Sequence, residues 1–155
     1  MGVITRHQLL LLCLRQRCPS QSRTLKMTCP SEWVFPISPI AASRPRVSRH
    51  GAYFTGPYKR FRQECATCVY DILGSDFELL TGPLAIDLEL FITQPKTTKL
   101  LCPKADIDNY IKAILDVMNG KLWEDDSQII QLYATKQWAC KGETGYFNLG
   151  VEGAR

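Results

Sequence analysis

The sequence predicts an α+β domain in which one mixed or antiparallel sheet packs against two helices. Three observations predict this fold: a long alternating run from Leu84 to Ile92, two segments with apolar residues at helical spacing, and short alternating runs near both ends of the domain. A chain of 155 residues fits one such domain, because two would each be too small to bury a useful core.

The expected strands are short and separated by turn-forming residues. We expect strands over residues 33–39, 84–92, 128–137 and 146–151, and a basic hairpin over residues 44–54 that turns at His50-Gly51. The run over 84–92 is the clearest, because Leu and Ile alternate there with acidic residues, as in a strand with one buried face.

Two helices are expected between these strands. The first begins at Pro57 and ends at Gly74, and the second runs from Asn109 to Met118 and is ended by Asn119-Gly120. Their expected buried stripes are Phe61, Cys65, Cys68, Val69 and Ile72 on the first, and Ile111, Ile114, Leu115 and Met118 on the second.

Residues 1–30 are expected to form a leader that is separate from the domain at 31–153. The apolar run Leu9–Leu14 is shorter than the core of a signal peptide, which has about 7–15 residues, while the Arg- and Ser-containing composition resembles a transit peptide. A start at Met27 is the alternative, in which case the preceding residues are not part of the protein. Either way we exclude the leader from the fold.

Composition favours a protein that does not enter membranes and that resides in a reducing compartment. No apolar run approaches the roughly 18–20 residues needed to span a bilayer.

Seven Cys are scattered along the chain. The pair Cys65-x-x-Cys68 lacks the second pair of ligands that a structural zinc site needs, so both cysteines are expected to be core residues. Free thiols are typical of cytoplasm.

Charge is distributed unevenly along the chain. Residues 1–62 carry eleven Lys and Arg and one acid, Glu32, whereas residues 104–126 carry six acids and three Lys. A basic half beside an acidic cluster suits a protein that holds a polyanion and places metal ions against it. The alternative is two solvated faces of opposite sign.

The acidic cluster supplies candidate ligands for a divalent cation. Asp106 and Asp108 point the same way only on extended chain, and Asp108 is expected to be the N-cap of the following helix. Hydrolysis of a phosphodiester needs an activated water and neutralised charge, and Mg²⁺ held by carboxylates supplies both. Lys112 could stabilise the developing charge. Asp125 and Asp126 are expected to open the next strand.

Simpler explanations exist for each of these residues. Asp108 could only cap a helix, Lys112 and Asp116 could be an i,i+4 pair, and Asp125-Asp126 could mark a turn. A calcium-binding EF-hand is excluded, because Ile111 stands where that loop requires Gly.

The full pattern resembles the RusA family of Holliday junction resolvases. It reads Asp106-x-Asp108-Asn109-x-x-Lys112-Ala113-x-x-Asp116, then Trp123-x-Asp125-Asp126-Ser127-Gln128, preceded by Ser43-Arg44-Pro45-Arg46-Val47. The resemblance runs from about Trp33 to Val151. Residue types, order and loop length agree together, which a lone Asp-x-Asp would not show.

This resemblance implies a homodimer that binds four-way DNA junctions in recombination and repair and nicks two strands symmetrically with Mg²⁺ or Mn²⁺. The family's metal-binding catalytic aspartates fall on Asp106, Asp108 and Asp126, and its functional lysine falls on Lys112. Supporting roles fall on Asn109, Asp116 and Asp125. The resemblance further implies a cytoplasmic protein encoded by a bacterium or a phage, including a prophage.

The basic residues near the first helix are the expected DNA contacts. They are Arg44, Arg46, Arg49, Lys59, Arg60 and Arg62. Contacts of this kind read backbone shape, which suits a junction better than a base sequence. A merely solubilising surface, a non-catalytic junction-binding dimer and a nuclease for other branched DNA remain as alternatives.

Overall fold

A computed structural model describes residues 31–44, 46–49, 51–54 and 56–153. The expected leader, residues 1–30, lies outside the described residues. The elements in chain order are β1 (Ser31–Phe35), β2 (Arg46–Ser48), β3 (Gly51–Tyr53), α2 (Gly56–Leu73), β4 (Leu84–Ile92), α3 (Ile107–Met118), the short 3₁₀ helix η1 (Asp126–Gln128), β5 (Ile129–Trp138) and β6 (Tyr146–Gly153).

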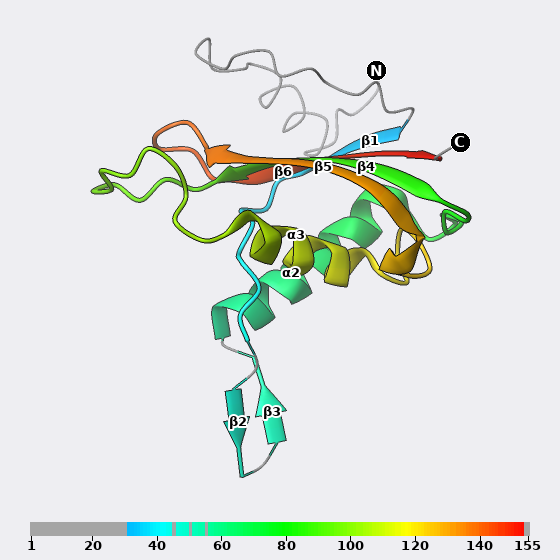
Figure 1. Ribbon diagram of the computed structural model, residues 1–155, viewed down its shortest axis with the longest axis horizontal. Coiled ribbons are helices and arrows are strands. Elements are labelled where there is room, and N and C mark those ends of the chain that lie inside the picture. Colours follow the sequence, from blue (N-terminus) through cyan, green and yellow to red (C-terminus); the bar gives the residue numbers. More distant parts are fainter. Residues whose placement is uncertain (1–30, 45, 50, 55, 154–155) are drawn as a thin grey trace, which may run out of the picture.

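Four strands form one mixed sheet in the order β1-β6-β4-β5. Strand β4 pairs antiparallel with β6 and parallel with β5, so β5 is an edge strand. Helices α2 and α3 both lie on one face of this sheet (Figure 1). The expected α+β class, with one mixed sheet and two helices, is confirmed.

The expected basic hairpin is also confirmed, and it does not join the sheet. Strands β2 and β3 pair antiparallel, with Ser48 opposite Gly51, and make a separate two-stranded sheet. This hairpin, which we call the arm, projects away from the body beside the start of α2 (Figure 1). The arm therefore carries basic sequence outside the core.

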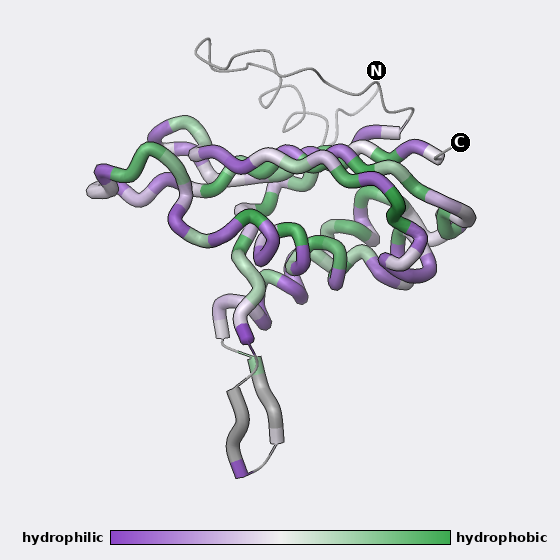
Figure 2. Tube along the Cα trace, in the orientation of Figure 1, coloured by the Kyte–Doolittle hydropathy of each residue, from purple (hydrophilic) through white to green (hydrophobic). Residues whose placement is uncertain are grey.

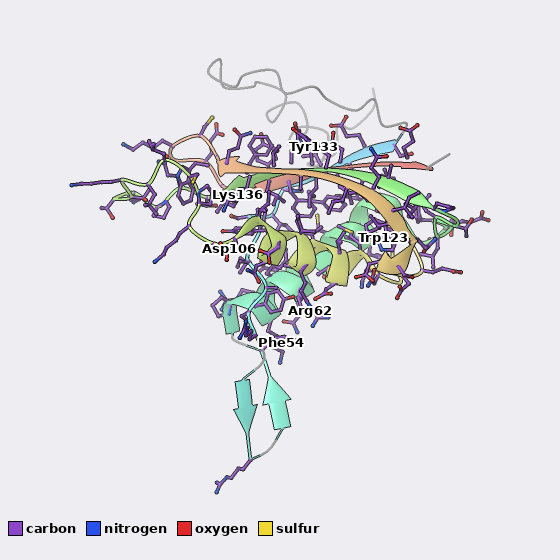
Figure 3. The ribbon with its side chains drawn as sticks, in the orientation of Figure 1. Phe54, Arg62, Asp106, Trp123, Tyr133 and Lys136 are labelled. Atoms are coloured by element: carbon purple, nitrogen blue, oxygen red, sulfur yellow. The ribbon has the colours of Figure 1, made fainter. Side chains whose placement is uncertain are left out.

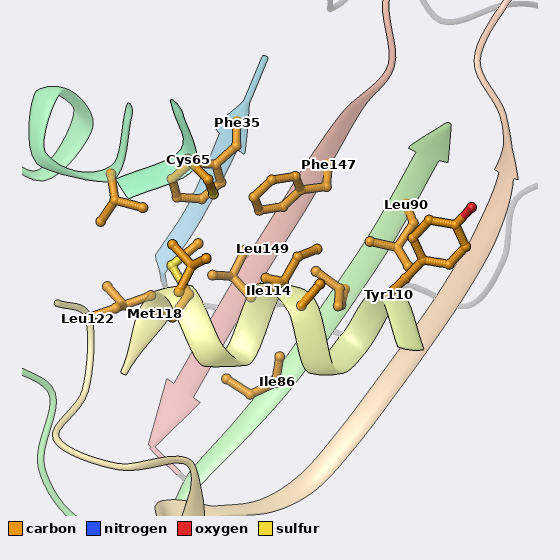
Figure 4. Close-up of a cluster of buried hydrophobic side chains, with 14 of the residues drawn as sticks. Phe35, Cys65, Ile86, Leu90, Tyr110, Ile114, Met118, Leu122, Phe147 and Leu149 are labelled. Atoms are coloured by element: carbon orange, nitrogen blue, oxygen red, sulfur yellow. The ribbon is translucent and has the colours of Figure 1, made fainter. Parts of the chain in front are cut away.

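The core lies between the sheet and the two helices. Every second residue of β4, from Leu84 to Ile92, is buried in the main hydrophobic cluster, as its alternation predicts. In the close-up, Ile114 and Met118 of α3 lie against side chains from the strands (Figure 4). Hydrophobic and hydrophilic stretches alternate along both helices (Figure 2), as expected for helices with one buried face.

The two cysteines at the centre of α2 are core residues, as expected. Cys65 is fully buried, and Cys68 is half-buried against the same cluster. Burial, together with the neighbouring Cys68, raises the pKa of the Cys65 thiol to about 12, and burial raises that of Cys68 to about 11. Both thiols are therefore protonated at neutral pH and are poor nucleophiles.

Some expected boundaries are wrong by a few residues. β1 ends at Phe35 and not at Pro39, because the backbone turns there and the N–H of Ile37 bonds to the carbonyl of Phe35. Helix α3 begins at Ile107, two residues earlier than expected, since Ile107 packs against the core.

Within the described residues, no helix has the length and apolar character needed to cross a membrane.

We predict that the packing of α3 carries much of the stability of this fold. Ile114 is 0% exposed, so Ile114→Ala should lower the free energy of unfolding by about 2–5 kcal/mol, through lost burial and the cavity left behind. Urea denaturation followed by circular dichroism measures this change. Tyr70→Ala, at a position of α2 that is 63% exposed, is the control and should change stability by less than about 0.5 kcal/mol. An equal loss in both variants would contradict the prediction.

Candidate active site

The first candidate acids lie where the chain enters α3. Asp106 is the N-cap residue of this helix, with extended backbone, and its side chain makes no capping hydrogen bond. The expectation that Asp108 is the N-cap is wrong, because the helix starts earlier and Asp108 lies in its first turn. The two acids therefore do not share an extended segment. Both side chains are exposed, so both carboxylates can meet a ligand from solvent.

A lysine of β5 holds the residue immediately before these acids. The ammonium group of Lys136 donates a hydrogen bond to the carbonyl oxygen of Ala105. Lys136 stands opposite Leu90 in the strand register, in the row of β5 that faces the helices. In Figure 3, Lys136 and Asp106 lie at the same end of the molecule. The sheet is thus tied directly to the segment that carries the acids.

A second side chain of the same row holds the preceding loop. The indole N–H of Trp138 donates to the carbonyl oxygen of Leu100 at 2.9 Å. Together with Lys136, this contact fixes the loop between β4 and α3 at two points. Sequence reasoning missed Lys136, although a lysine at an inward position of an alternating strand was the available signal.

The first turn of α3 is also hydrogen-bonded to the segment that precedes the arm. The backbone N–H of Ala42 donates to the carbonyl oxygen of Asn109 at 2.8 Å, and the side-chain amide of Asn109 donates to Asp108 at 3.3 Å. The base of the arm and the two acids are therefore neighbours. Asn109 supports this arrangement through both its backbone and its side chain.

Lys112 and Asp116 lie further along α3 and differ in how far their side chains are exposed to solvent. Lys112 is exposed and lies one turn beyond Asp108 on the same side of the helix. Asp116 is half-buried and accepts a hydrogen bond from the hydroxyl of Tyr58 on α2, at 3.5 Å. Burial, and then the charge of Asp116, raise the pKa of Tyr58. Asp116 therefore connects the two helices.

Asp125 and Asp126 lie in η1, beyond the other end of α3. The expectation that they open the next strand is wrong, because Asp125 caps a 3₁₀ turn that precedes β5. Its carboxylate accepts the backbone N–H of Ser127 at 2.9 Å, and hydrogen bonding to Ser127 lowers the pKa of Asp125. Asp125 thus has a structural role here, while the side chain of Asp126 is exposed.

The candidate acids do not converge within one chain. Asp106 and Asp108 lie at the start of α3, whereas Asp126 follows the turn after its end. Figure 3 shows Asp106 and Trp123, which precedes Asp126 by three residues, on opposite sides of the view. Over the part of the chain that the structure describes, no three Asp, Glu, His or Cys side chains gather closely enough to hold a metal ion.

The expected DNA contacts gather at the arm and the start of α2. Lys59 and Arg60 are exposed in the first turn of α2, and Arg44 and Arg49 are exposed at the arm. The side chain of Arg46 lies outside the described side chains.

One of these basic residues has an aromatic partner. Arg62 lies over the ring of Phe54, with its guanidinium carbon 5.5 Å from the ring centre, and the rings of Phe54 and Tyr58 are 5.2 Å apart, edge to face. These contacts join Phe54, which follows the last strand of the arm, to α2, and Figure 3 shows Phe54 and Arg62 together there.

Comparison with known proteins identifies the chain. Residues 36–145 match the model of a family described as endodeoxyribonuclease RusA. The chain belongs to this family. The resemblance inferred from the sequence is confirmed, and the matched segment of this RusA-family protein contains Asp106, Asp108, Lys112 and Asp126. The family supports an endodeoxyribonuclease activity.

The sequence of this RusA-family chain is also similar to that of a bacterial protein. An uncharacterized protein named YqaN, from Bacillus subtilis (strain 168), is 31% identical over 119 residues. The alignment covers 63% of this chain and 80% of that protein. The similarity therefore extends over most of the relative.

We predict that Lys136 stabilises the start of α3. Lys136→Met removes the hydrogen bond to Ala105, so amide hydrogen exchange in residues 104–110 should become about ten-fold faster, while Lys136→Arg should restore most of the protection. Lys141→Met, at an exposed lysine just beyond β5, is the charge-matched control and should leave this segment unchanged. Equal exchange in the Lys136→Met variant and the unmodified protein would show that the contact has no such effect.

Proposed function

We propose that this RusA-family protein is a metal-dependent endodeoxyribonuclease that acts as a homodimer and resolves four-way DNA junctions by paired nicks. The observation that supports this proposal most is the family match over residues 36–145, which contains every candidate acid and Lys112. All three proposed ligands, Asp106, Asp108 and Asp126, are exposed, as groups that must meet a DNA backbone have to be.

The chemistry of the acids suits a divalent cation. Mg²⁺ prefers carboxylate oxygens and water, and the Asp106 carboxylate is not used in capping its helix. Bound there, Mg²⁺ or Mn²⁺ would lower the pKa of a water and neutralise charge on the phosphate. Asp106 and Asp108 would hold the cation at one end of α3. Lys112, exposed one turn further, would stabilise the negative charge that develops on the phosphate.

The basic residues of the arm and of α2 would hold the DNA backbone. The arm connects to α3 through the Ala42–Asn109 hydrogen bond, so a duplex bound along Arg44, Lys59 and Arg60 would pass close to Asp106. Phosphate contacts of this kind position a duplex without reading its sequence, which fits a substrate recognised by its branched shape.

The first test compares DNA substrates. With Mg²⁺, the unmodified protein should introduce paired symmetric nicks into a synthetic four-way junction, and should cut a linear duplex at least about a hundred-fold more slowly. Asp108→Asn should lose at least about a hundred-fold in rate while still binding the junction, because a metal ligand is removed and the basic residues remain. Preferential cutting of flaps would assign another branched substrate, and binding without cutting would favour a non-catalytic junction-binding protein.

The second test concerns the phosphate contacts. The double variant Lys59→Gln, Arg60→Gln removes two exposed cations at the start of α2. If both contact phosphates, the slope of log binding constant against log salt should become shallower by about 1.8, since each contact contributes about 0.9. Fluorescence anisotropy of a labelled junction between about 50 and 200 mM salt measures this slope. An unchanged slope would remove these residues from the DNA-binding surface.

A further inference from the structure

The loop between β4 and α3 carries two adjacent exposed leucines, which we call the leucine pair. Leu101 is 99% exposed and Leu100 is 51% exposed. The loop projects beyond the end of the sheet in Figure 1, and Figure 2 shows a hydrophobic stretch on it between hydrophilic ones. Single exposed apolar side chains are common on protein surfaces, but an adjacent pair beside a candidate active site is a candidate contact surface.

Contacts on both sides hold the leucine pair in its outward position. The backbone N–H of Leu100 donates to the hydroxyl of Thr98 at 3.2 Å, and the carbonyl oxygen of Leu100 accepts the indole N–H of Trp138 at 2.9 Å. Pro103, two residues beyond Leu101, is buried. The backbone is thus fixed before and after Leu101, so the exposure of this side chain is a property of the folded loop. Folding removes almost none of its surface from water.

The loop around the leucine pair is basic. Residues 93–104 contain three lysines and no acid. Lys96, Lys99 and Lys104 are all exposed. Lysines at these positions attract a polyanion, and the apolar pair between them suits a partner that has apolar surface beside its charge. DNA offers both where base stacking is interrupted, because its phosphates are charged and the faces of its unstacked bases are not.

The leucine pair lies within reach of DNA bound at the candidate acids. Leu101 precedes Asp106 by five residues, so the two are at most about 18 Å apart, even along fully extended chain. At about 3.4 Å per nucleotide of one strand, this distance is about five base steps. Lys136 of β5 bonds to Ala105, which fixes the end of the loop beside Asp106. A branch point near the phosphate that is cut therefore falls within the range of the leucine pair.

We propose that the leucine pair is an apolar wedge that contacts unstacked bases at the branch point of the DNA substrate. This inference rests on the proposed function and adds the feature by which the protein selects its substrate. Apolar side chains of this type enter base steps in DNA-binding proteins and keep them unstacked. Insertion into a continuous duplex costs the stacking of one step, whereas stacking at a branch point is already interrupted. The leucine pair thereby favours branched over linear DNA.

Fluorescence of 2-aminopurine placed at the branch point tests the contact directly, because this base analogue fluoresces more strongly when it is unstacked. The Asp108→Asn protein, used so that the DNA is not cut, should raise the fluorescence of a labelled four-way junction on saturation. Adding Leu101→Ser should abolish most of this rise. An equal rise with and without Leu101→Ser would overturn the proposal.

Competition between labelled and unlabelled DNA measures the selectivity. Leu101→Ser should weaken junction binding about ten-fold, since burial of one leucine side chain is worth at least about that factor. The affinity for linear duplex should change by less than about two-fold, because the phosphate contacts remain. Leu101→Met keeps an apolar side chain of similar size and should retain the selectivity. A ratio of junction to duplex affinity that Leu101→Ser leaves unchanged would contradict the wedge.

Two further variants serve as matched controls. Tyr70→Ser removes a side chain of α2 that is 63% exposed, and it should change neither the fluorescence nor the selectivity. Lys99→Gln removes a cation next to the leucine pair, and it should weaken binding of junction and duplex alike. A loss of selectivity in Tyr70→Ser as large as that in Leu101→Ser would count against a specific role for the leucine pair.

The oligomeric state of Leu101→Ser excludes a different occupant. Because Leu101 contacts DNA in this proposal and not a second protein chain, sedimentation velocity and the circular dichroism spectrum should be those of the unmodified protein. A change of oligomeric state would make the leucine pair a contact between protein chains and would overturn the proposal.

The proposed function is read separately, from cleavage of the four-way junction by the unmodified protein with Mg²⁺. A fluorescence rise that depends on Leu101, without cleavage by the unmodified protein, would reject the proposed nuclease and retain the wedge. Junction cleavage without such a rise would reject the wedge alone.

Discussion

Helix α3 packs across the sheet through its buried residues, among them Tyr110, Ile114 and Met118, and this contact positions the candidate acids that lie along the helix and beyond its end. The helix is a rigid spacer, because its backbone hydrogen bonds set its length. Its start is bonded to β5 through Lys136 and to the base of the arm through Ala42. Its end is held through Trp123. The acids consequently have little freedom of position.

Much of the fold could be predicted because its signals are local. The alternation in β4 is clear since the strand is central and one of its faces meets the helices, and the helical stripe of α2 follows from the same burial. The start of α3 could not be predicted in this way. Both Asp106 and Asp108 satisfy the preference of N-caps for aspartate, and only the packing of Ile107 against the core decides between them.

The residues of the candidate site could be named from the sequence more easily than they could be placed. Asp106, Asp108 and Asp126 lie close together in the sequence, which favoured a single cluster, but a straight helix stands between them. Lys136 was missed because its partner, Ala105, is 31 residues away, beyond the reach of any spacing rule. Asp125 was placed in a strand because a capping turn of three residues leaves almost no periodic signal.

The parallel pairing of β4 with β5 has a consequence for how the protein folds. Parallel neighbours cannot be joined by a tight turn, so a long crossover runs from the end of β4 to the start of β5, and it contains α3 and η1. Closing so large a loop has an entropic cost that is offset only when α3 docks on the sheet. All the candidate acids lie on this crossover. The candidate site is therefore assembled in the same slow step that completes the sheet, and a chain in which the crossover has not docked holds its candidate acids in no fixed arrangement.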